Sequence, residues 1–479
     1  MSAQTASLAG EALRTFNYVV LGYFALITVS YLAITLLSAV ASQRYTRRRS
    51  SAALQRALRS RLTPPVTICV PVHNERVSIA GALRAMLTLN YPEFEVIVTN
   101  DGSTDDTLGH LIEEFDLRRV DQPLRRDMST AAVRGVYRSR MHDGLVVLDK
   151  ENGGRADALN AALNAARYPL VCFVDADSIL DQDTLLTASL PFVERPDLTV
   201  GVGGIIRVAN GCEIVNGHVV AVHLPQSPVA MFQTVEYLRA FLAARTGWSL
   251  INGLLIISGA LGVFRRSAVA EVGGLAAGSI GEDFELCVRL HRKAHDEGRD
   301  YRLEFVPDPV CWTEVPERLT ELGGQRNRWH RGLIDTLWRH RRMIGNPRYG
   351  SVGMLALPFF ILFELLGTLV EVAGYVAIAV AFAFGVVNTE FALIFVLVAV
   401  FSGVLLSLSA VLLEDLAFRS YGGLRELTRL IAYSVFENFG YRQVITLFRI
   451  GGFFSYLRGD KTWGVIERLG FHSAEDAAG

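Results

Sequence analysis

Two aspartates, one residue apart, stand directly after an apolar run in the middle of the chain. Asp175 and Asp177 follow Leu170 to Val174, and Ala176 separates them. A run that is apolar at every position is typical of a strand buried on both faces of a parallel sheet. Such sheets bind ligands at the carboxyl ends of their strands, where two carboxylates can share a divalent cation that also holds a diphosphate. We therefore predict a Mg²⁺ or Mn²⁺ site here, although a strand followed by a capped helix explains the same residues.

Two strand-like runs upstream also end in polar side chains. Asp101 ends the run that begins at Glu95, and Gly102 after it permits a tight turn, from which the carboxylate could bond a base or ribose. Glu75 follows the run that begins at Val66. Because ligands collect at such strand ends, we expect Asp101 and Glu75 to line the same site.

A glycine-rich turn lies between two cations. Lys150 and Arg155 flank Gly153-Gly154, and a helical pattern follows. Cations and free backbone N–H groups near a helix start suit a diphosphate. A helix that merely begins after a glycine-rich entry fits these residues equally well.

Two further stretches suggest catalysis and substrate approach. Glu282 and Asp283 fall in the first turn of a predicted helix, where Asp283 could act as a general base. Carboxylates in a first turn also stabilise the helix dipole, so a purely structural role stays open. Ser258 and Gly259 interrupt an apolar run, where a substrate could approach the backbone closely.

An amide, a guanidinium and an indole share one face of a later helix. Gln325, Arg328 and Trp329 are spaced i, i+3 and i+4. Together they could bind a sugar and a phosphate by stacking, charge and hydrogen bonding. An arginine-rich helix lying on anionic lipid is the alternative, but it explains neither Trp329 nor Gln325.

Alternating strand and helix patterns over 63–348 predict an α/β domain with a mainly parallel sheet. The net charge of −1 argues against a nucleic-acid partner, which needs a basic footprint. The five cysteines form no C-x-x-C pair, so we expect no zinc site.

Long apolar segments flank this domain, and arginines cluster after the first of them, which places that side in the cytoplasm. Before the domain we predict an extracytoplasmic amino terminus over 1–16, a transmembrane helix over 17–42 and a basic juxtamembrane segment over 43–62. The α/β domain with interfacial helices occupies 63–348, and an interfacial part with two transmembrane helices follows over 349–416. The chain then continues with an interfacial, re-entrant or channel-lining segment over 417–457 and a carboxyl-terminal tail over 458–479, in which Trp463 could cap the site.

Together these stretches resemble the membrane-embedded, processive branch of glycosyltransferase family 2, which includes synthases of cellulose, chitin, hyaluronan and poly-N-acetylglucosamine. The resemblance runs from about Thr63 to Trp329. The family's pattern is an aspartate in the uridine site, a D-x-D metal motif, an E-D base motif and Q-x-x-R-W. In this chain these fall, in that order, on Asp101, on Asp175 and Asp177, on Glu282 and Asp283, and on Gln325, Arg328 and Trp329.

The resemblance implies a cytosolic GT-A (Rossmann-like) domain that binds a UDP-sugar through Mg²⁺ or Mn²⁺ and inverts the anomeric centre to give a β-linkage. The roles it implies are catalysis by Asp283 and Glu282, donor binding by Asp101, Glu75, Lys150, Arg155, Asp175 and Arg328, acceptor binding by Trp329, Gln325, Glu314, Ser258 and Gly259, and metal binding by Asp177 and Asp175. It further implies a multi-pass protein of the bacterial inner (cell) membrane whose partners are a UDP-sugar, a glycan or lipid acceptor and the bilayer; an accessory subunit stays open.

Two departures disfavour cellulose as the product. Only one predicted span precedes the catalytic domain, and the break at Ser258-Gly259-Ala260 lacks the cysteine of cellulose synthases. We therefore favour an N-acetylglucosamine-type or other exopolysaccharide that the protein also translocates. One alternative is a glycosyltransferase that adds one or a few sugars to a lipid, although transferases of that kind usually lack Q-x-x-R-W. An inactive membrane scaffold or receptor is the other, and the retained acidic motifs argue against it.

Overall fold

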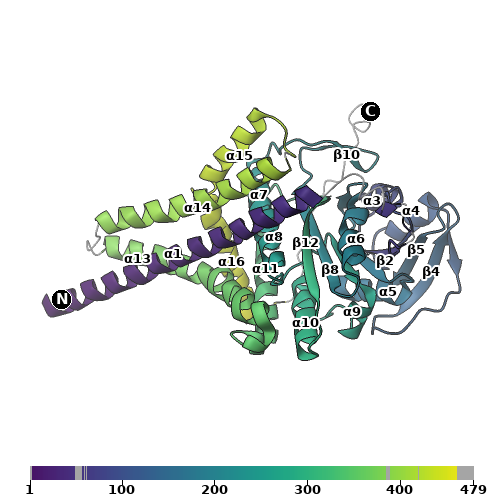
Figure 1. Ribbon diagram of the computed structural model, residues 1–479, viewed down its shortest axis with the longest axis horizontal. Coiled ribbons are helices and arrows are strands. Elements are labelled where there is room, and N and C mark those ends of the chain that lie inside the picture. The colour runs from purple at the N-terminus through teal and green to yellow at the C-terminus, as the bar shows by residue number, and fades with distance from the viewer. Residues whose placement is uncertain are drawn as a thin grey trace.

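The structure, a computed structural model, describes residues 3–48, 57–58, 60, 62–383, 389–418 and 420–460. A domain built on one large sheet occupies one end of the molecule, and long helices extend from it towards the other end (Figure 1). Trp463 and most of the predicted tail lie outside the described residues. Their expected position near the site stays a prediction.

Within the described residues the large sheet has ten strands in the order β3-β4-β5-β2-β1-β6-β11-β8-β12-β7. In chain order these are β1 (Val66–Val72), β2 (Phe94–Asp101), β3 (Leu117–Val120), β4 (Val133–Ser139), β5 (Leu145–Lys150), β6 (Leu170–Phe173), β7 (Ser178–Leu180), β8 (Thr199–Val208), β11 (Gly262–Arg265) and β12 (Arg302–Thr313). A separate hairpin pairs β9 (Glu213–Val215) with β10 (His218–Ala221).

The centre of the sheet is parallel and its edges are mixed. β5, β2, β1 and β6 run parallel to one another, and every residue of β6 is buried, as its apolar sequence predicts. β11 is antiparallel to β6 and β8, and β4 is antiparallel to β3 and β5. The α/β prediction is confirmed. β12 is parallel to β8 and antiparallel to β7, so seven of the ten described strands run in one direction and β4, β7 and β11 run against them. The sheet is mixed, and most of its strands share the predicted parallel direction; apolar periodicity identifies a strand without giving its direction.

Helices cover this sheet between its strands. They are α3 (Ile79–Leu87), α4 (Thr107–Glu114), α5 (Arg155–Ala165), α6 (Thr184–Glu194), α9 (Arg266–Glu271) and α10 (Glu282–Asp296). α5 is rich in alanine and leucine and packs across β1 and β2, which brings its first residue to the carboxyl end of the parallel strands.

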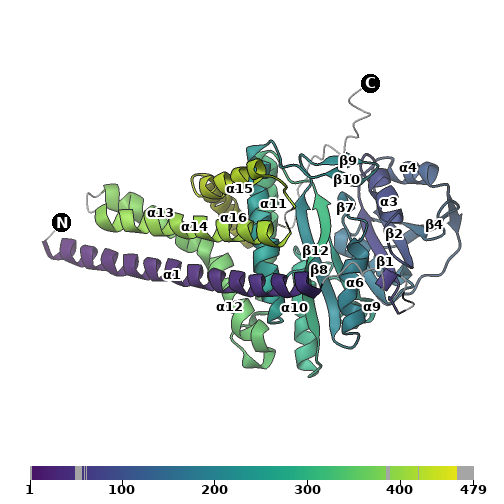
Figure 2. The same ribbon diagram turned by 45° about the horizontal axis from the view of Figure 1, so that its top comes forward.

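Three of the described helical stretches are long and apolar enough to cross a membrane: Tyr18–Arg47, Val352–Val380 and Val396–Ala417. They belong to α1 (Ala3–Arg48), to α13 (Leu366–Ala383) with the preceding short helices η4 (Val352–Ala356), α12 (Leu357–Phe359) and η5 (Phe360–Leu365), and to α14 (Thr389–Ala417). α1, α13 and α14 leave the domain in the same direction (Figures 1 and 2). The predicted span over 17–42 lies within α1, and the two predicted over 349–416 lie within the other stretches.

Further described helices lie where the sheet domain meets the long apolar helices. They are α7 (Pro228–Tyr237), η1 (Leu238–Arg245), α8 (Thr246–Leu250), α11 (Leu319–Arg339), η2 (Arg341–Met343), η3 (Pro347–Tyr349), α15 (Leu424–Phe436) and α16 (Tyr441–Leu457). α16 packs along α11 (Figure 1). With 13 and 17 residues, α15 and α16 are shorter than the roughly 20 residues of a simple span. The interfacial, re-entrant or channel-lining position expected for 417–457 stays a prediction.

Candidate active site

The predicted site residues of the first half lie on neighbouring loops at one edge of the sheet. β1, β2 and β6 are adjacent and parallel, so the loops after them emerge side by side. The loops after β1 and β6 carry Glu75 and the pair Asp175 and Asp177, and Asp101 is the last residue of β2. The arrangement is the one expected for a ligand site in an α/β sheet.

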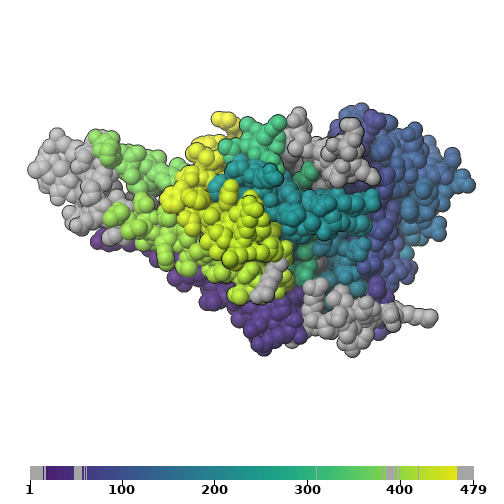
Figure 3. Space-filling model, turned by 90° about the horizontal axis from the view of Figure 1, so that it is seen from above, coloured from purple at the N-terminus to yellow at the C-terminus, as the bar shows by residue number. Residues whose placement is uncertain are grey.

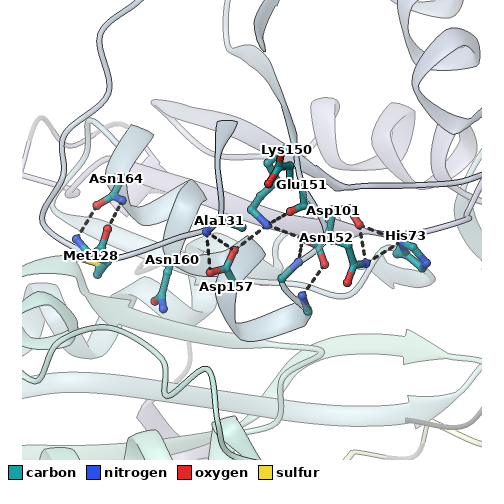
Figure 4. Close-up of polar contacts among 12 residues, drawn as sticks. His73, Asp101, Met128, Ala131, Lys150, Glu151, Asn152, Asp157, Asn160 and Asn164 are labelled. Carbon is teal, nitrogen blue, oxygen red and sulfur yellow. Dashed lines mark hydrogen bonds and ion pairs between the residues drawn. The ribbon is translucent and has the colours of Figure 1, made fainter. Parts of the chain in front are cut away.

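Asp101 is held by the loop that follows β5 (Figure 4). Its Oδ1 atom accepts hydrogen bonds from Lys150 Nζ at 2.5 Å and from the Gly153 N–H at 2.9 Å. Its Oδ2 atom accepts from the Gly154 N–H at 2.7 Å, and its carbonyl accepts from Asn152 Nδ2 at 2.8 Å. These bonds fix the Asp101 carboxylate and join the two loops.

Lys150 is completely buried between two carboxylates. Its ammonium nitrogen lies 2.6 Å from Asp157 Oδ1 as well as 2.5 Å from Asp101 Oδ1. From the sequence we expected this lysine and the N–H groups of the glycine pair to bind a diphosphate. We correct that role: the lysine side chain is 0% exposed and both glycine N–H groups bond Asp101, because buried carboxylates need compensating charge and donors. Lys150 therefore positions Asp101.

Asn74 connects the loop after β1 to the loop after β2. It adopts a left-handed conformation with φ of 58°, and its Oδ1 atom accepts from the Thr104 N–H at 2.7 Å. The next residue, Glu75, precedes α3, and its Oε2 atom accepts from Ser78 Oγ at 2.7 Å. Glu75 is partly exposed beside Asp101's loop, and its role in donor binding stays a prediction.

Arg155, the first residue of α5, joins three motifs that are far apart in the sequence. Its Nε and NH2 atoms donate to Asp175 Oδ1 at 2.9 and 2.7 Å. Its NH1 atom pairs with Glu282, and its NH2 atom also donates to the Gly259 carbonyl at 2.9 Å. Arg155 was expected to face a diphosphate, and in the described structure it holds the D-x-D and E-D segments together.

The charges at Arg155 compensate each other. Burial lowers the pKa of Arg155, but Asp175 and Glu282 outweigh burial, so the net pKa lies above its usual value. Burial raises the pKa of Glu282, and the Arg155 charge opposes that rise. Glu282 is only 5% exposed, so this carboxylate is a buried partner of Arg155.

Asp283 is the more accessible carboxylate of the E-D pair. It is partly exposed, whereas its neighbour Glu282 is buried. Its Oδ1 atom accepts from the Phe284 N–H at 2.8 Å, and its Oδ2 atom accepts from the Gly259 N–H at 3.3 Å. These bonds hold the carboxylate in one orientation beside the segment that Arg155 also contacts. Such a fixed and accessible carboxylate can take a proton from a bound hydroxyl.

There is no room for a larger side chain at Gly259. A Cβ atom there would lie 2.5 Å from Arg155 NH2. Ser258 before it is partly exposed, and its Oγ atom accepts from the Ala260 N–H at 3.4 Å. The backbone of this segment therefore approaches the Arg155 guanidinium closely, as the break in the apolar run suggested.

Asp175 and Asp177 fit a cation that is shared with a ligand. The side chain of Asp175 is 34% exposed, and Asp177 is 8% exposed. Among the described residues no group of three or more His, Cys, Asp or Glu side chains could hold a metal ion by itself. Two carboxylates suit Mg²⁺ or Mn²⁺, which commonly take their remaining ligands from substrate phosphates and water.

The Q-x-x-R-W residues lie on α11, which packs against α10, the helix that begins with the E-D motif. A Cβ atom on Gly332 of α11 would lie 3.1 Å from the Cα atom of Gly281, which immediately precedes Glu282. Trp329 is 45% exposed, and the Oε1 atom of Gln325 is buried without a hydrogen-bond partner. Arg328 is partly buried on the same helix. Glu314, directly after β12, is also partly buried.

Arg245 is a residue that the sequence pattern did not identify. Burial lowers its pKa to about 10, and the nearby Asp283 charge opposes that change. Its NH1 atom is buried without a hydrogen-bond partner, and its guanidinium lies 3.9 Å from the Phe241 ring centroid. An arginine in an amphipathic helix gives no signal that it will approach the base motif, so only the structure places it there.

Comparison with known proteins agrees with this geometry. Residues 170–408 match the family described as "Glycosyl transferase family group 2", and residues 67–272 match "Glycosyl transferase family 2". The chain is 29% identical over 274 residues to a poly-beta-1,6-N-acetyl-D-glucosamine synthase of Staphylococcus epidermidis. It is also 29% identical over 275 residues to the synthase of the same name from Staphylococcus aureus (strain COL). Each match covers 57% of this chain and 56% of the relative, so the chain spans only about half the length of these curated relatives.

Among solved structures, the fold is similar to that of the mannosyltransferase PcManGT from Pyrobaculum calidifontis, determined in complex with GDP-Man and Mn²⁺. The TM-score is 0.50 at 21% sequence identity, and the match covers 87% of this chain and 99% of the other. At that identity the likeness concerns the fold. The two family matches overlap and together run from residue 67 to residue 408, across the D-x-D, E-D and Q-x-x-R-W motifs, and the chain belongs to glycosyltransferase family 2.

Proposed function

We propose that this membrane glycosyltransferase transfers a sugar from a UDP-sugar to a growing β-linked polysaccharide, with inversion at the anomeric centre. The observation that carries the proposal is the Arg155 bridge, which brings Asp175 of the D-x-D motif within hydrogen-bond distance of the same guanidinium as Glu282 of the E-D motif. Donor and base motifs are therefore joined in one site. N-acetylglucosamine is the favoured sugar, because the named staphylococcal relatives are poly-N-acetylglucosamine synthases.

The chemical step uses Asp283 as the general base. The acceptor hydroxyl oxygen attacks the anomeric carbon of the donor, its proton passes to a carboxylate oxygen of Asp283, and the bond from the anomeric carbon to the diphosphate oxygen breaks as UDP leaves. The bond from the Gly259 N–H to Asp283 Oδ2 keeps that carboxylate oriented. Glu282 and Arg155 maintain the charge balance around the base.

The donor lies along the carboxyl edge of the parallel strands in this proposal. Asp101, fixed by Lys150, bonds the uridine, and Glu75 lies beside it. Asp175 and Asp177 would hold Mg²⁺ or Mn²⁺, which supplies positive charge to the leaving diphosphate. Arg328 of α11 would add a guanidinium to the donor in this proposal.

The acceptor lies towards α11. Trp329 offers an exposed indole for stacking on a sugar ring, and the unpartnered Gln325 Oε1 atom can accept a hydrogen bond from a sugar hydroxyl. Glu314 and the Ser258-Gly259 segment complete this side. An exposed indole platform on α11 favours retention of a glycan between additions, and therefore processive synthesis.

The orientation of the protein in the membrane is inferred from the arginines at one end of the first candidate span. Arginines cluster at the carboxyl end of the first candidate span, at positions 44, 47, 48 and 49, which favours a cytoplasmic catalytic domain in the bacterial inner (cell) membrane. The product would then leave the cytoplasmic face across the membrane along the three candidate spans. An accessory subunit for that step stays a hypothesis.

Radiolabelled UDP-sugars offered to the purified protein in lipid, with Mn²⁺ or Mg²⁺, test the proposal. We expect a high-molecular-weight product from UDP-N-acetylglucosamine, its loss when EDTA removes the metal, and its loss in Asp283→Asn. Asp296→Asn, on the same helix but at its other end, is the matched control and should keep activity. A small product extractable into organic solvent would replace the polysaccharide by a lipid acceptor, and no transfer from any donor would contradict the proposal.

A further inference from the structure

A buried arginine within the Q-x-x-R-W segment has no part in the mechanism above. The side chain of Arg326 is 1% exposed, although it carries a charge. Its guanidinium carbon lies 4.3 Å from the centroid of the Trp329 ring, one helical turn further along α11. Trp329 itself is 45% exposed. The indole therefore rests on Arg326 and remains open to a ligand elsewhere on its surface.

Two other helices hold this arginine. Arg326 NH2 donates to Glu236 Oε2 of α7 at 2.9 Å, and the hydroxyl of Tyr441, the first residue of α16, donates to the same oxygen at 3.1 Å. The Tyr441 ring stacks on Phe232 of α7 with centroids 4.6 Å apart. The Nε and NH1 atoms of Arg326 are buried without hydrogen-bond partners, so its charge depends mainly on Glu236 and the π-face of Trp329.

α16 contacts α11 within the motif, and a residue just after α16 contacts α11 one position beyond His330. Asn327 Nδ2 donates to Ser455 Oγ at 3.2 Å, and Arg331 NH1 donates to the Asp460 carbonyl at 2.7 Å. The two helices approach so closely that a Cβ atom on Gly452 would lie 2.8 Å from the Asn327 carbonyl oxygen. In the space-filling view the yellow and yellow-green carboxyl-terminal surface adjoins the teal surface of the α7 region (Figure 3). α16 is thus fixed against the turn that carries the motif.

We propose that α16 orients the acceptor platform: Arg326, fixed by Glu236 and Tyr441, is a positioning residue that sets the plane of the Trp329 ring for a β-linked sugar chain. The proposal rests on the acceptor role given to Trp329 above. It assigns a function to α16, which lies beyond residue 408, where the family matches end.

The physical reason is the geometry of stacking. A sugar binds an indole through its flat face, so its affinity depends on which side-chain rotamer the tryptophan occupies. The planar guanidinium favours one ring orientation by covering the opposite face. Removing the Tyr441 hydroxyl leaves α16 packed on Phe232 but releases one of the two bonds that hold the Glu236 carboxylate.

The test uses the full chain in lipid, UDP-N-acetylglucosamine as donor and a soluble β-linked N-acetylglucosamine pentamer as acceptor. Tyr441→Phe and Arg326→Lys should raise KM for the pentamer about threefold to tenfold and shorten the product, while KM for the donor changes less than about twofold. Tyr433→Phe is the matched control, since its ring lies 5.0 Å from the same Phe232, and it should behave as the wild type.

A second readout needs no catalysis. Acrylamide quenching of Trp329 fluorescence, obtained by subtracting the signal of Trp329→Phe, should increase in Tyr441→Phe and Arg326→Lys at unchanged melting temperature. Unchanged quenching and unchanged pentamer KM in both variants would overturn the inference.

Trp329→Ala separates this inference from the proposed function. If that variant raises the pentamer KM and the two positioning variants do not, the inference is overturned and the acceptor role of Trp329 stands. If Trp329→Ala leaves the pentamer KM unchanged, the acceptor role fails, and the inference fails with it.

Discussion

The proposed donor side and the proposed acceptor side of the site are built differently. On the donor side the charged groups pair with one another: Lys150 lies between Asp101 and Asp157, and Arg155 lies between Asp175 and Glu282. On the proposed acceptor side one polar group has no hydrogen-bond partner and another depends on two other helices. Gln325 Oε1 is buried without a partner, and Trp329 is exposed over an arginine that α7 and α16 hold.

This difference matches what each side must do. In the proposed mechanism the same nucleotide-sugar binds at every cycle, so a preorganised set of charges lowers the cost of its binding. In the proposed processive synthesis the glycan slides after each addition, and an exposed ring with few fixed bonds permits this movement. Four substitutions test the contrast, beginning with the one expected to have the largest effect.

Arg155→Gln should lower kcat/KM about a thousandfold, because it leaves Glu282 buried without its cation and releases Asp175. Initial rates of UDP release measure this effect. Arg195→Gln, which breaks the more exposed pair with Glu304, is the control and should keep nearly full activity. Comparable rates in the two variants would show that the Arg155 bridge is dispensable.

Lys150→Met should lower the free energy of unfolding by about 3 kcal/mol, because two buried carboxylates lose their shared cation. Thermal unfolding in detergent or lipid measures the loss. Lys293→Met removes a lysine that pairs with Glu297 at the surface of α10 and should cost less than about 0.5 kcal/mol. Equal losses in both variants would contradict the structural role of Lys150.

Gly259→Ala should lower kcat about tenfold, because the added methyl group would lie 2.5 Å from Arg155 NH2 and displace the guanidinium. Gly278→Ala is the matched control, since the nearest atom to its Cβ would be 4.0 Å away. Steady-state kinetics compare the two. Full activity of Gly259→Ala would mean that the guanidinium moves freely.

Gln325→Ala should have the smallest effect, about a threefold rise in acceptor KM at unchanged melting temperature, because its Oε1 atom has no hydrogen bond to lose in the free protein. Gly324→Ala, the preceding residue on α11, has open space for a Cβ and should change neither quantity. A fall in stability without a change in KM would make Gln325 a structural residue and weaken the contrast between the two sides.

The sequence predicted much of the fold and the main site segments. The continuous apolar run of β6 predicted a fully buried strand, and the D-x-D pair after it lies at the expected edge of the sheet. The first turn of α10 begins at Glu282, as predicted. These features depend on local patterns, namely strand burial, helix spacing and turn residues, which a single sequence contains.

The partners of buried charges could not be predicted in this way. Lys150 and Arg155 have similar sequence surroundings, a glycine pair and a helix start, yet the first is buried beneath Asp101 and the second spans two other motifs. No sequence pattern indicated that Arg245 lies near the base motif. Which carboxylate a cation meets depends on residues brought together across the sheet, and local sequence carries no record of those distances.

By itself, then, the sequence determined the order of the motifs, the α/β domain and the apolar segments, because each follows from periodicity and residue chemistry over short stretches. Only the tertiary structure decided that Arg155 contacts residues 104 and 127 positions away, and that α16 packs on the helix of Trp329. The reason is that ion pairs and close helix packing act over a few ångströms in space, and folding alone sets which residues come that near.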